Sequence, residues 1–211
     1  MKKDYRNTEY CSSLKDIDKK KKELNTEICK EHPRAKIIYN QIKDADKKYK
    51  AKFMKIYNYK CGYCGNSIWN LSKTLFEVDH YICASSFVTK EEAGKIENLV
   101  LSCYDCNRAK SKFPIEHKYI DKVNPDLEEI TKVFIRDDMY YIKISQIYKN
   151  DRFIRDFYKQ LRLGYETRRL DFLLMNLQGL CHRLGDRPEA NKLSIVLNKL
   201  QQKRNLTNCK M

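Results

Sequence analysis

The sequence of 211 residues contains no run of about 18 consecutive apolar residues, which is the length that a membrane-spanning helix requires. No apolar stretch follows the initial Met1-Lys2-Lys3, so a secretory signal peptide is not expected either. Glycine and proline are scarce, at 6 and 4 residues, and neither an internal repeat nor a low-complexity linker is present. These absences argue against a membrane protein, a secreted protein and a string of loosely linked modules. We expect a compact protein of the cytoplasm.

Cysteine, by contrast, is abundant, with 9 residues. Four of them form two Cys-x-x-Cys knuckles, Cys61 to Cys64 and Cys103 to Cys106. Two knuckles supply four thiolates, which complete the tetrahedral shell of a structural zinc site and leave no position open for a substrate. Without a secretory signal, metal binding with reduced thiols is a better interpretation than disulfides. The other cysteines are scattered and odd in number: Cys11, Cys29, Cys83, Cys181 and Cys209.

Positive charge dominates, with a net charge of +15, and it is unevenly distributed. Residues 1–60 carry +9, residues 61–120 are neutral and residues 121–211 carry +6. The segment with the knuckles is thus flanked by two basic regions. A positive field of this kind favours contact with a nucleic-acid backbone, although Lys-rich helix faces such as residues 19–22 also serve solubility alone.

Apolar periodicity predicts a mainly helical chain. Helices are expected at residues 12–31 and 35–57, short strands at 74–79 and 99–101, and a helix at 106–112 after an irregular segment at 81–96. A hairpin is expected between residues 133–135 and 140–144, followed by helices at about 150–163, 166–184 and 188–204. The leucines at 170, 173, 174, 177 and 180 are better explained as core contacts than as a partner groove.

Four polar residues lie within the segment that the knuckles bracket: Asp79, His80, Asn98 and Asn107. Together they are the side-chain set of a metal-dependent phosphodiesterase. A lone histidine would most often be structural, but His80 adjoins an aspartate between the knuckles. The remaining histidines, His32, His117 and His182, have no such neighbours.

The runs Val78-Asp79-His80, Glu97 to Cys103 and Cys106 to Lys112 together resemble the zinc-stapled HNH endonucleases. The resemblance covers residues 56–114, about a quarter of the chain. It implies a ββα-metal core inside an α+β, mainly α protein. The expected domains are a basic helical region at 1–55, the nuclease core at 56–114, and a hairpin with helices at 115–211.

The resemblance implies a role for each residue. His80 is the expected general base, and Asp79 and Asn107 are the expected ligands of a catalytic Mg²⁺ or Mn²⁺ ion. Asn107 stands where many members carry histidine, which makes this a His-Asn-Asn variant. Asn98 orients the base or braces the loop, or it is simply a turn former. Lys110 lies one helical turn after Asn107 and is expected to contact substrate phosphates, and Arg108 either does the same or is a solvated helix residue.

Two departures from the family pattern concern the loop after His80. Cys83 stands where a proline is common, and residues 85–96 lack the usual glycine-rich stretch. Neither removes a catalytic group, but both bear on loop geometry.

Several functions remain open from the sequence. The leading hypothesis is a nuclease that cuts DNA, with RNA not excluded. The layout also looks like the HNH partner of Septu-type anti-phage systems, which implies an SMC- or ABC-like ATPase partner docking near residues 170–180. The alternatives are a restriction or homing-type nuclease, and a zinc-stapled adaptor that binds nucleic acid without cutting it. A double-strand cut would need a homo- or hetero-oligomer.

Overall fold

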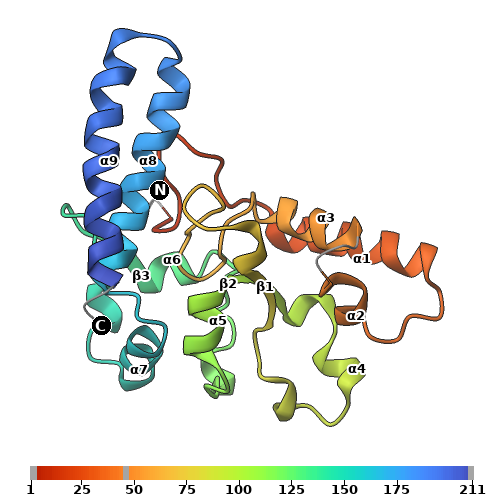
Figure 1. Ribbon diagram of the computed structural model, residues 1–211. Coiled ribbons are helices and arrows are strands. Elements are labelled where there is room, and N and C mark those ends of the chain that lie inside the picture. Colours follow the sequence, from red (N-terminus) through yellow and green to blue (C-terminus); the bar gives the residue numbers. More distant parts are fainter. Residues whose placement is uncertain (1–3, 45–47, 209–211) are drawn as a thin grey trace.

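The computed structural model describes residues 4–44 and 48–208, and it has an α+β architecture that is mainly helical (Figure 1). In these residues the strands form two antiparallel pairs, β1 (Phe76–His80) with β2 (Leu99–Cys103), and β3 (Phe134–Arg136) with β4 (Ile142–Ile144). The helices are α1 (Ile17–Glu31), α2 (Tyr39–Ile42), α3 (Lys48–Ile56), α4 (Lys90–Ala93), α5 (Tyr104–Lys110), α6 (Ile130–Val133), α7 (Arg152–Gln160), α8 (Glu166–Leu184) and α9 (Pro188–Asn208).

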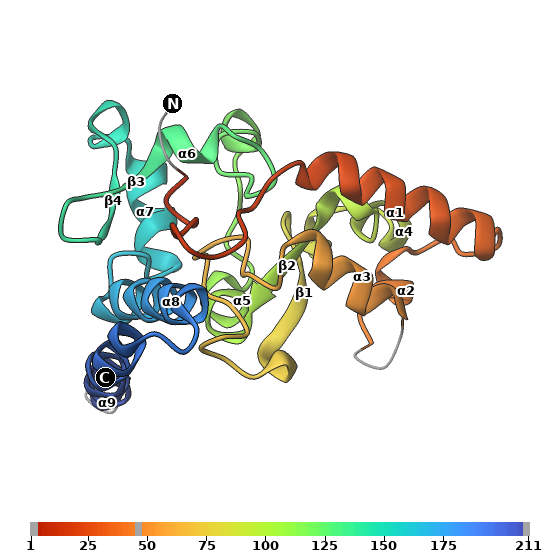
Figure 2. The same ribbon diagram turned by 90° about the horizontal axis from the view of Figure 1, so that it is seen from above.

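The β1–β2 pair lies at the centre of the molecule, with α5 packed against both strands (Figure 2). All five residues of β2 are buried, which suits its nearly continuous apolar sequence. The register pairs Phe76 with Cys103 and His80 with Leu99. Asp79 and His80 therefore lie at one end of the β1–β2 pair, and the second knuckle begins at the opposite end.

The N-terminal helices cover one side of this sheet. The apolar stripe of α1 is buried, and so is Lys21 from the basic run, whose ammonium group pairs with Asp126 at 2.5 Å. The prediction of one helix over residues 35–57 is wrong. Residues 35–38 are not helical, because this stretch packs against Gly94, whose carbonyl accepts the Tyr39 N–H at 3.0 Å. The helix predicted at 12–31 starts later, at Ile17.

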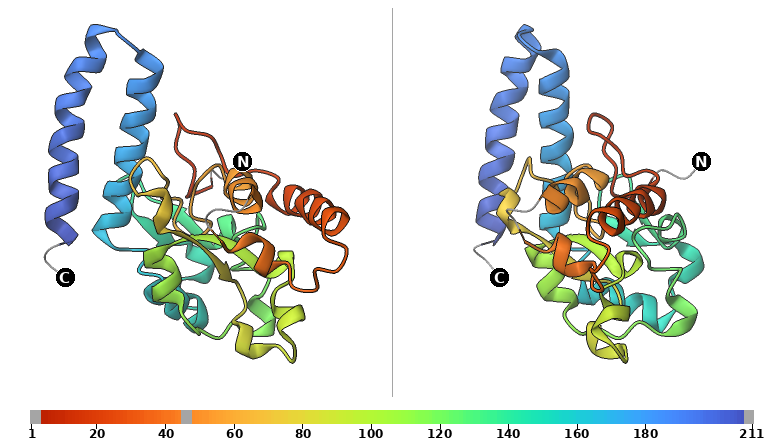
Figure 3. Two further views of the ribbon diagram at one scale, coloured as in Figure 1. Left: turned by 45° about the vertical axis from the view of Figure 1, so that its right-hand side comes forward. Right: turned by 90° about the vertical axis from the view of Figure 1, so that its right-hand side faces the viewer.

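The C-terminal region contains α6, the predicted hairpin β3–β4 and, after the hairpin, helices α7, α8 and α9. The Asp151 side chain caps α7 by accepting the Ile154 N–H. Helices α8 and α9 pack side by side and extend together beyond the body of the protein (Figure 3). The turn between them contains Gly185, whose φ of 59° favours glycine.

One hydrophobic core runs from the N-terminal helices through the sheet to α7. It includes apolar residues from each of the three regions, such as Ile28, Leu101 and Phe157. No helix in the described part of the chain is both long enough and apolar enough to cross a membrane.

Candidate active site and metal centre

The two knuckles converge on one buried cluster. The sulfur atoms of Cys61, Cys64, Cys103 and Cys106 all lie within 4.8 Å of one another, and the Cys64 and Cys103 sulfurs are 3.8 Å apart. Four sulfurs at about 2.3 Å from a zinc ion would be separated by about 3.8 Å along each tetrahedral edge. The donor set and its spacing fit a zinc staple.

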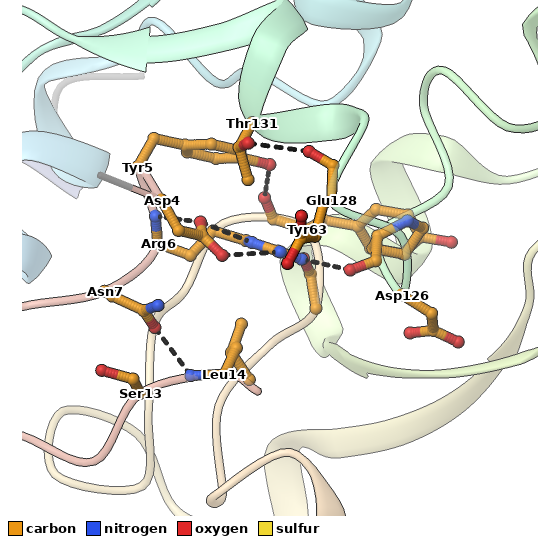
Figure 4. A network of polar contacts seen from close by, with 12 residues as sticks. Asp4, Tyr5, Arg6, Asn7, Ser13, Leu14, Tyr63, Asp126, Glu128 and Thr131 are labelled. Carbon is orange, nitrogen blue, oxygen red and sulfur yellow. Dashed lines mark hydrogen bonds and ion pairs between the residues drawn. The ribbon is translucent and has the colours of Figure 1, made fainter. Parts of the chain in front are cut away.

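The N-terminal segment braces the first knuckle from outside (Figure 4). The Arg6 guanidinium donates to the Gly62 carbonyl at 2.7 Å, and the Tyr5 hydroxyl donates to the Tyr63 carbonyl at 2.6 Å. Gly65 has a φ of 78°, and a side chain there would collide with the Arg6 backbone. The knuckle is thus shaped by residues nearly 60 positions away in sequence.

Asp79 points into the protein, where its side chain is 7% exposed. One carboxylate oxygen accepts the Tyr63 hydroxyl at 2.6 Å, and the Lys110 ammonium lies 3.0–3.1 Å from both oxygens. Burial raises the pKa of the Asp79 carboxyl, and Lys110 opposes that shift. The ammonium of Lys110, itself 1% exposed, therefore faces Asp79 and the His80 carbonyl rather than solvent.

His80 is half-buried at the end of β1. Its ring packs against the Tyr39 ring, with centroids 4.4 Å apart and planes at 43°. Burial first, and the charge of Lys110 second, lower the pKa of His80 below its ordinary value. Both effects favour the neutral imidazole, which is the form that can accept a proton.

Both the oxygen and the nitrogen of the Asn98 side-chain amide form hydrogen bonds to the loop that follows His80. Its amide oxygen accepts the Ile82 N–H at 2.8 Å, and its amide nitrogen donates to the carbonyls of Ile82 at 3.0 Å and Ala93 at 2.9 Å. Within this loop, α4 begins with a capping box between Thr89 and Glu92. These bonds order a segment that lacks the expected glycine-rich stretch.

Asn107 lies on α5 and donates its amide hydrogen to the carboxylate of Glu77. The other oxygen of Glu77 accepts from Arg108 at 3.2 Å. Because side chains alternate along a strand, Glu77 and Asp79 lie on the same face of β1. That face presents two carboxylates toward α5, from which Asn107 and Lys110 project.

Three contributors to the site were missed by the motif-based interpretation: Tyr39, Lys50 and Glu77. The strand period of two was a usable signal for Glu77, since it precedes Asp79 by two residues. Tyr39 and Lys50 come from the N-terminal helices and have no local signal. Lys50 is 4% exposed, and burial lowers its pKa to about 8, opposed by the charge of Glu77.

Residues 61–113 match the family model described as HNH endonuclease. The chain carries an HNH endonuclease domain. The matched residues include both knuckles and all four of the polar residues singled out in the sequence. No curated protein and no solved structure was found to match the chain.

The HNH domain thus consists of the first knuckle, β1, the Asn98-fastened loop, β2 and α5, with the four-cysteine cluster at its base. The presence of an HNH domain supports the assignment of nuclease activity, with nucleic acid as the substrate. The departure at Cys83 is accommodated by a short turn, in which its sulfur lies 3.0 Å from the Ser85 hydroxyl.

Proposed function

We propose that this protein is a metal-dependent endonuclease that hydrolyses phosphodiester bonds in DNA, with His80 as the general base. The observation that carries the proposal is the HNH match over residues 61–113, within which β1 ends in Asp79-His80 and α5 presents Asn107 to the same strand. The basic flanks of the chain support a polyanionic substrate. RNA shares that backbone charge and stays an alternative substrate.

His80 would remove the proton from the attacking water. A general base contributes about 10²–10⁴-fold, and it works best when its pKa lies near the working pH. The lowered pKa of His80 favours the unprotonated ring, and Tyr39 limits the orientations of that ring by packing against it. Asn98 would act indirectly, by holding the segment that follows the base.

Asp79 and Asn107 would hold the catalytic Mg²⁺ or Mn²⁺ ion, and Glu77 adds a second carboxylate on the same face of β1. These hard oxygen donors suit such a cation. When bound, the ion would stabilise the negative charge that develops at the scissile phosphate. Lys110 balances the charge of Asp79 from the protein side, and Arg108, which is exposed beside Glu77, would contact substrate phosphates.

The four cysteines would hold a structural zinc ion and leave catalysis to the β1–α5 face. A cytoplasmic role in Septu-type anti-phage defence, with an ATPase partner, is a further proposal that rests on the resemblance in layout. The projecting α8–α9 hairpin offers such a partner an accessible surface. Recovery of no ATPase with the tagged protein from its native host would count against this role.

The decisive experiment is cleavage of supercoiled plasmid by the purified protein with magnesium, manganese or EDTA. His80→Ala is the test variant and His117→Ala the matched control, because His117 is exposed and lies outside the matched segment. Cutting that requires the metal, survives in His117→Ala and disappears in His80→Ala supports the proposal. Equal cutting by both variants would refute the role of His80.

One observation favours a second candidate, a nucleic-acid-binding adaptor without catalysis. Both oxygens of Asp79 already have protein partners, Tyr63 and Lys110, so the carboxylate is satisfied without a cation. An adaptor would bind DNA in a salt-dependent manner and keep that affinity after loss of Asp79 and His80. Binding of this kind with no cleavage under any metal condition, with or without an ATPase partner, would favour the adaptor.

A further inference from the structure

Arg168 of α8 reaches from the C-terminal region into the four-cysteine cluster. Its two terminal nitrogens lie 3.7 Å from the Cys64 sulfur and 3.4 Å from the Cys106 sulfur. The side chain is 4% exposed. One guanidinium therefore contacts one sulfur from each knuckle, although Arg168 lies more than 60 residues beyond the second.

The charge of the cluster explains why a buried arginine is stable there. Four thiolates around a divalent zinc ion leave a net charge of −2, which is costly in a buried site unless cations compensate it. The planar guanidinium points one terminal nitrogen at each sulfur in a fixed fork geometry, which the single ammonium nitrogen of a lysine does not reproduce.

A second group of hydrogen bonds joins the same face of α8 to the segment that follows the first knuckle. The Asp171 carboxylate accepts from Asn66 at 2.8 Å and from Arg204 of α9 at 2.9 Å. The Asp171 carbonyl also accepts from Asn70 at 2.8 Å. The contacts thus run from the thiolates through α8 to α9, so the base of the hairpin is docked on the metal centre, and the two helices extend away from it (Figure 3).

We propose that Arg168 is a positioning residue of the four-cysteine metal centre, and that through it zinc occupancy and docking of the α8–α9 hairpin stabilise each other. This inference rests on the zinc staple of the proposed function, but not on nuclease activity. Coupling of this kind is reciprocal, so loss of either element must weaken the other. The stability of the docked hairpin would then depend on whether zinc is bound, and this hairpin is also the surface proposed for partner docking.

The first test measures transfer of zinc from the intact, zinc-loaded chain to a chromogenic chelator. Arg168→Met is compared with Arg169→Met, because Arg169 is the next residue of α8 and also makes polar contacts, to Glu166 and the Met139 carbonyl. Loss of a residue that supports metal ligands typically costs 10–100-fold in affinity. We expect a loss in that range for Arg168→Met, a smaller one for Arg168→Lys, and wild-type retention for Arg169→Met.

Retention of zinc by Arg168→Met equal to that of the wild type would overturn the proposal, and so would equal losses in the two methionine variants. Metal analysis of the wild type comes first, and a preparation that binds no zinc refutes the staple and this inference together. The plasmid assay is independent of both outcomes. Failure of the nuclease proposal is therefore distinguishable from failure of this one.

The second test uses only the wild type, so it does not depend on the folding of a variant. Amide hydrogen exchange is compared between zinc-loaded protein and protein treated with a chelator. We expect faster exchange in residues 166–208 after zinc removal, along with the knuckles. Faster exchange in the knuckles with an unchanged hairpin would show that the two are not coupled, and would refute the proposal.

Discussion

Replacement of Lys110 by methionine tests whether the buried ion pair with Asp79 holds the β1–α5 face together. The ammonium group lies 3.0–3.1 Å from the Asp79 carboxylate oxygens and 2.8 Å from the His80 carbonyl, with side-chain exposures of 1% for Lys110 and 7% for Asp79. Methionine preserves most of the apolar stem and leaves the carboxylate buried with Tyr63 as its remaining partner.

Removal of one partner from a buried ion pair costs about 3–5 kcal/mol. For a protein of this size, each 1 kcal/mol lowers the melting temperature by about 2–4 °C, so we expect a fall of about 6–20 °C. Chemical denaturation gives the free energy of unfolding directly. Lys112→Met is the matched control, because Lys112 is exposed and its loss should change the free energy of unfolding by about 0.5 kcal/mol or less.

The double variant Asp79→Asn with Lys110→Met separates charge from packing. It removes the stranded carboxylate while keeping an acceptor for Tyr63, so it should recover part of the stability that Lys110→Met loses. A Lys110→Met protein within about 1 kcal/mol of the wild type would refute this reasoning. A double variant less stable than the single one would show that the loss has another origin.

Three further predictions concern other parts of the site. Asn98→Ala removes three hydrogen bonds to Ile82 and Ala93, so it should cost about 1–3 kcal/mol and speed amide exchange in residues 81–98; unchanged exchange there would contradict the bracing role. The pKa of Lys50 is lowered from its ordinary value of 10.5 to about 8 in the folded protein. Between these two pH values the unfolded chain binds more protons than the folded one, so the wild type gains stability as the pH rises. Lys50→Met should lack that gain and be about 1–3 kcal/mol more stable at pH 7, as measured by urea denaturation across pH; parallel pH profiles for the two proteins would refute it. Cys64→Ser should lose stoichiometric zinc and unfold cooperatively at lower temperature, and full zinc content in that variant would contradict the staple.

The local parts of the fold follow from the sequence because the signals are local. The knuckle spacing, the alternation of β1 and the polar turn of the hairpin each act within about ten residues. The convergence of Cys64 and Cys103 is also predictable, because a four-thiolate metal shell requires it.

The long-range partners of the site do not follow from the sequence. Tyr39 packs on His80 and Arg168 contacts the cysteines because helices distant in sequence cover the HNH segment, and no residue pattern encodes which face they present. Lys110 has helical spacing from Asn107, which suggested an exposed phosphate contact, but the carboxylate of Asp79 attracts it inward. The late start of the helix expected from residue 35 is likewise due to another segment, because the Tyr39 N–H at the start of α2 donates to the Gly94 carbonyl.

The central claim is that His80 performs base catalysis of phosphodiester hydrolysis. The most direct measurement is the single-turnover cleavage rate of a DNA duplex by the wild type and by His80→Ala, at saturating protein with magnesium or manganese present. The account predicts a rate at least about 100-fold lower for His80→Ala, with unchanged DNA affinity. Equal rates for the two proteins, or a wild type that binds DNA tightly and never cuts it, would contradict the account.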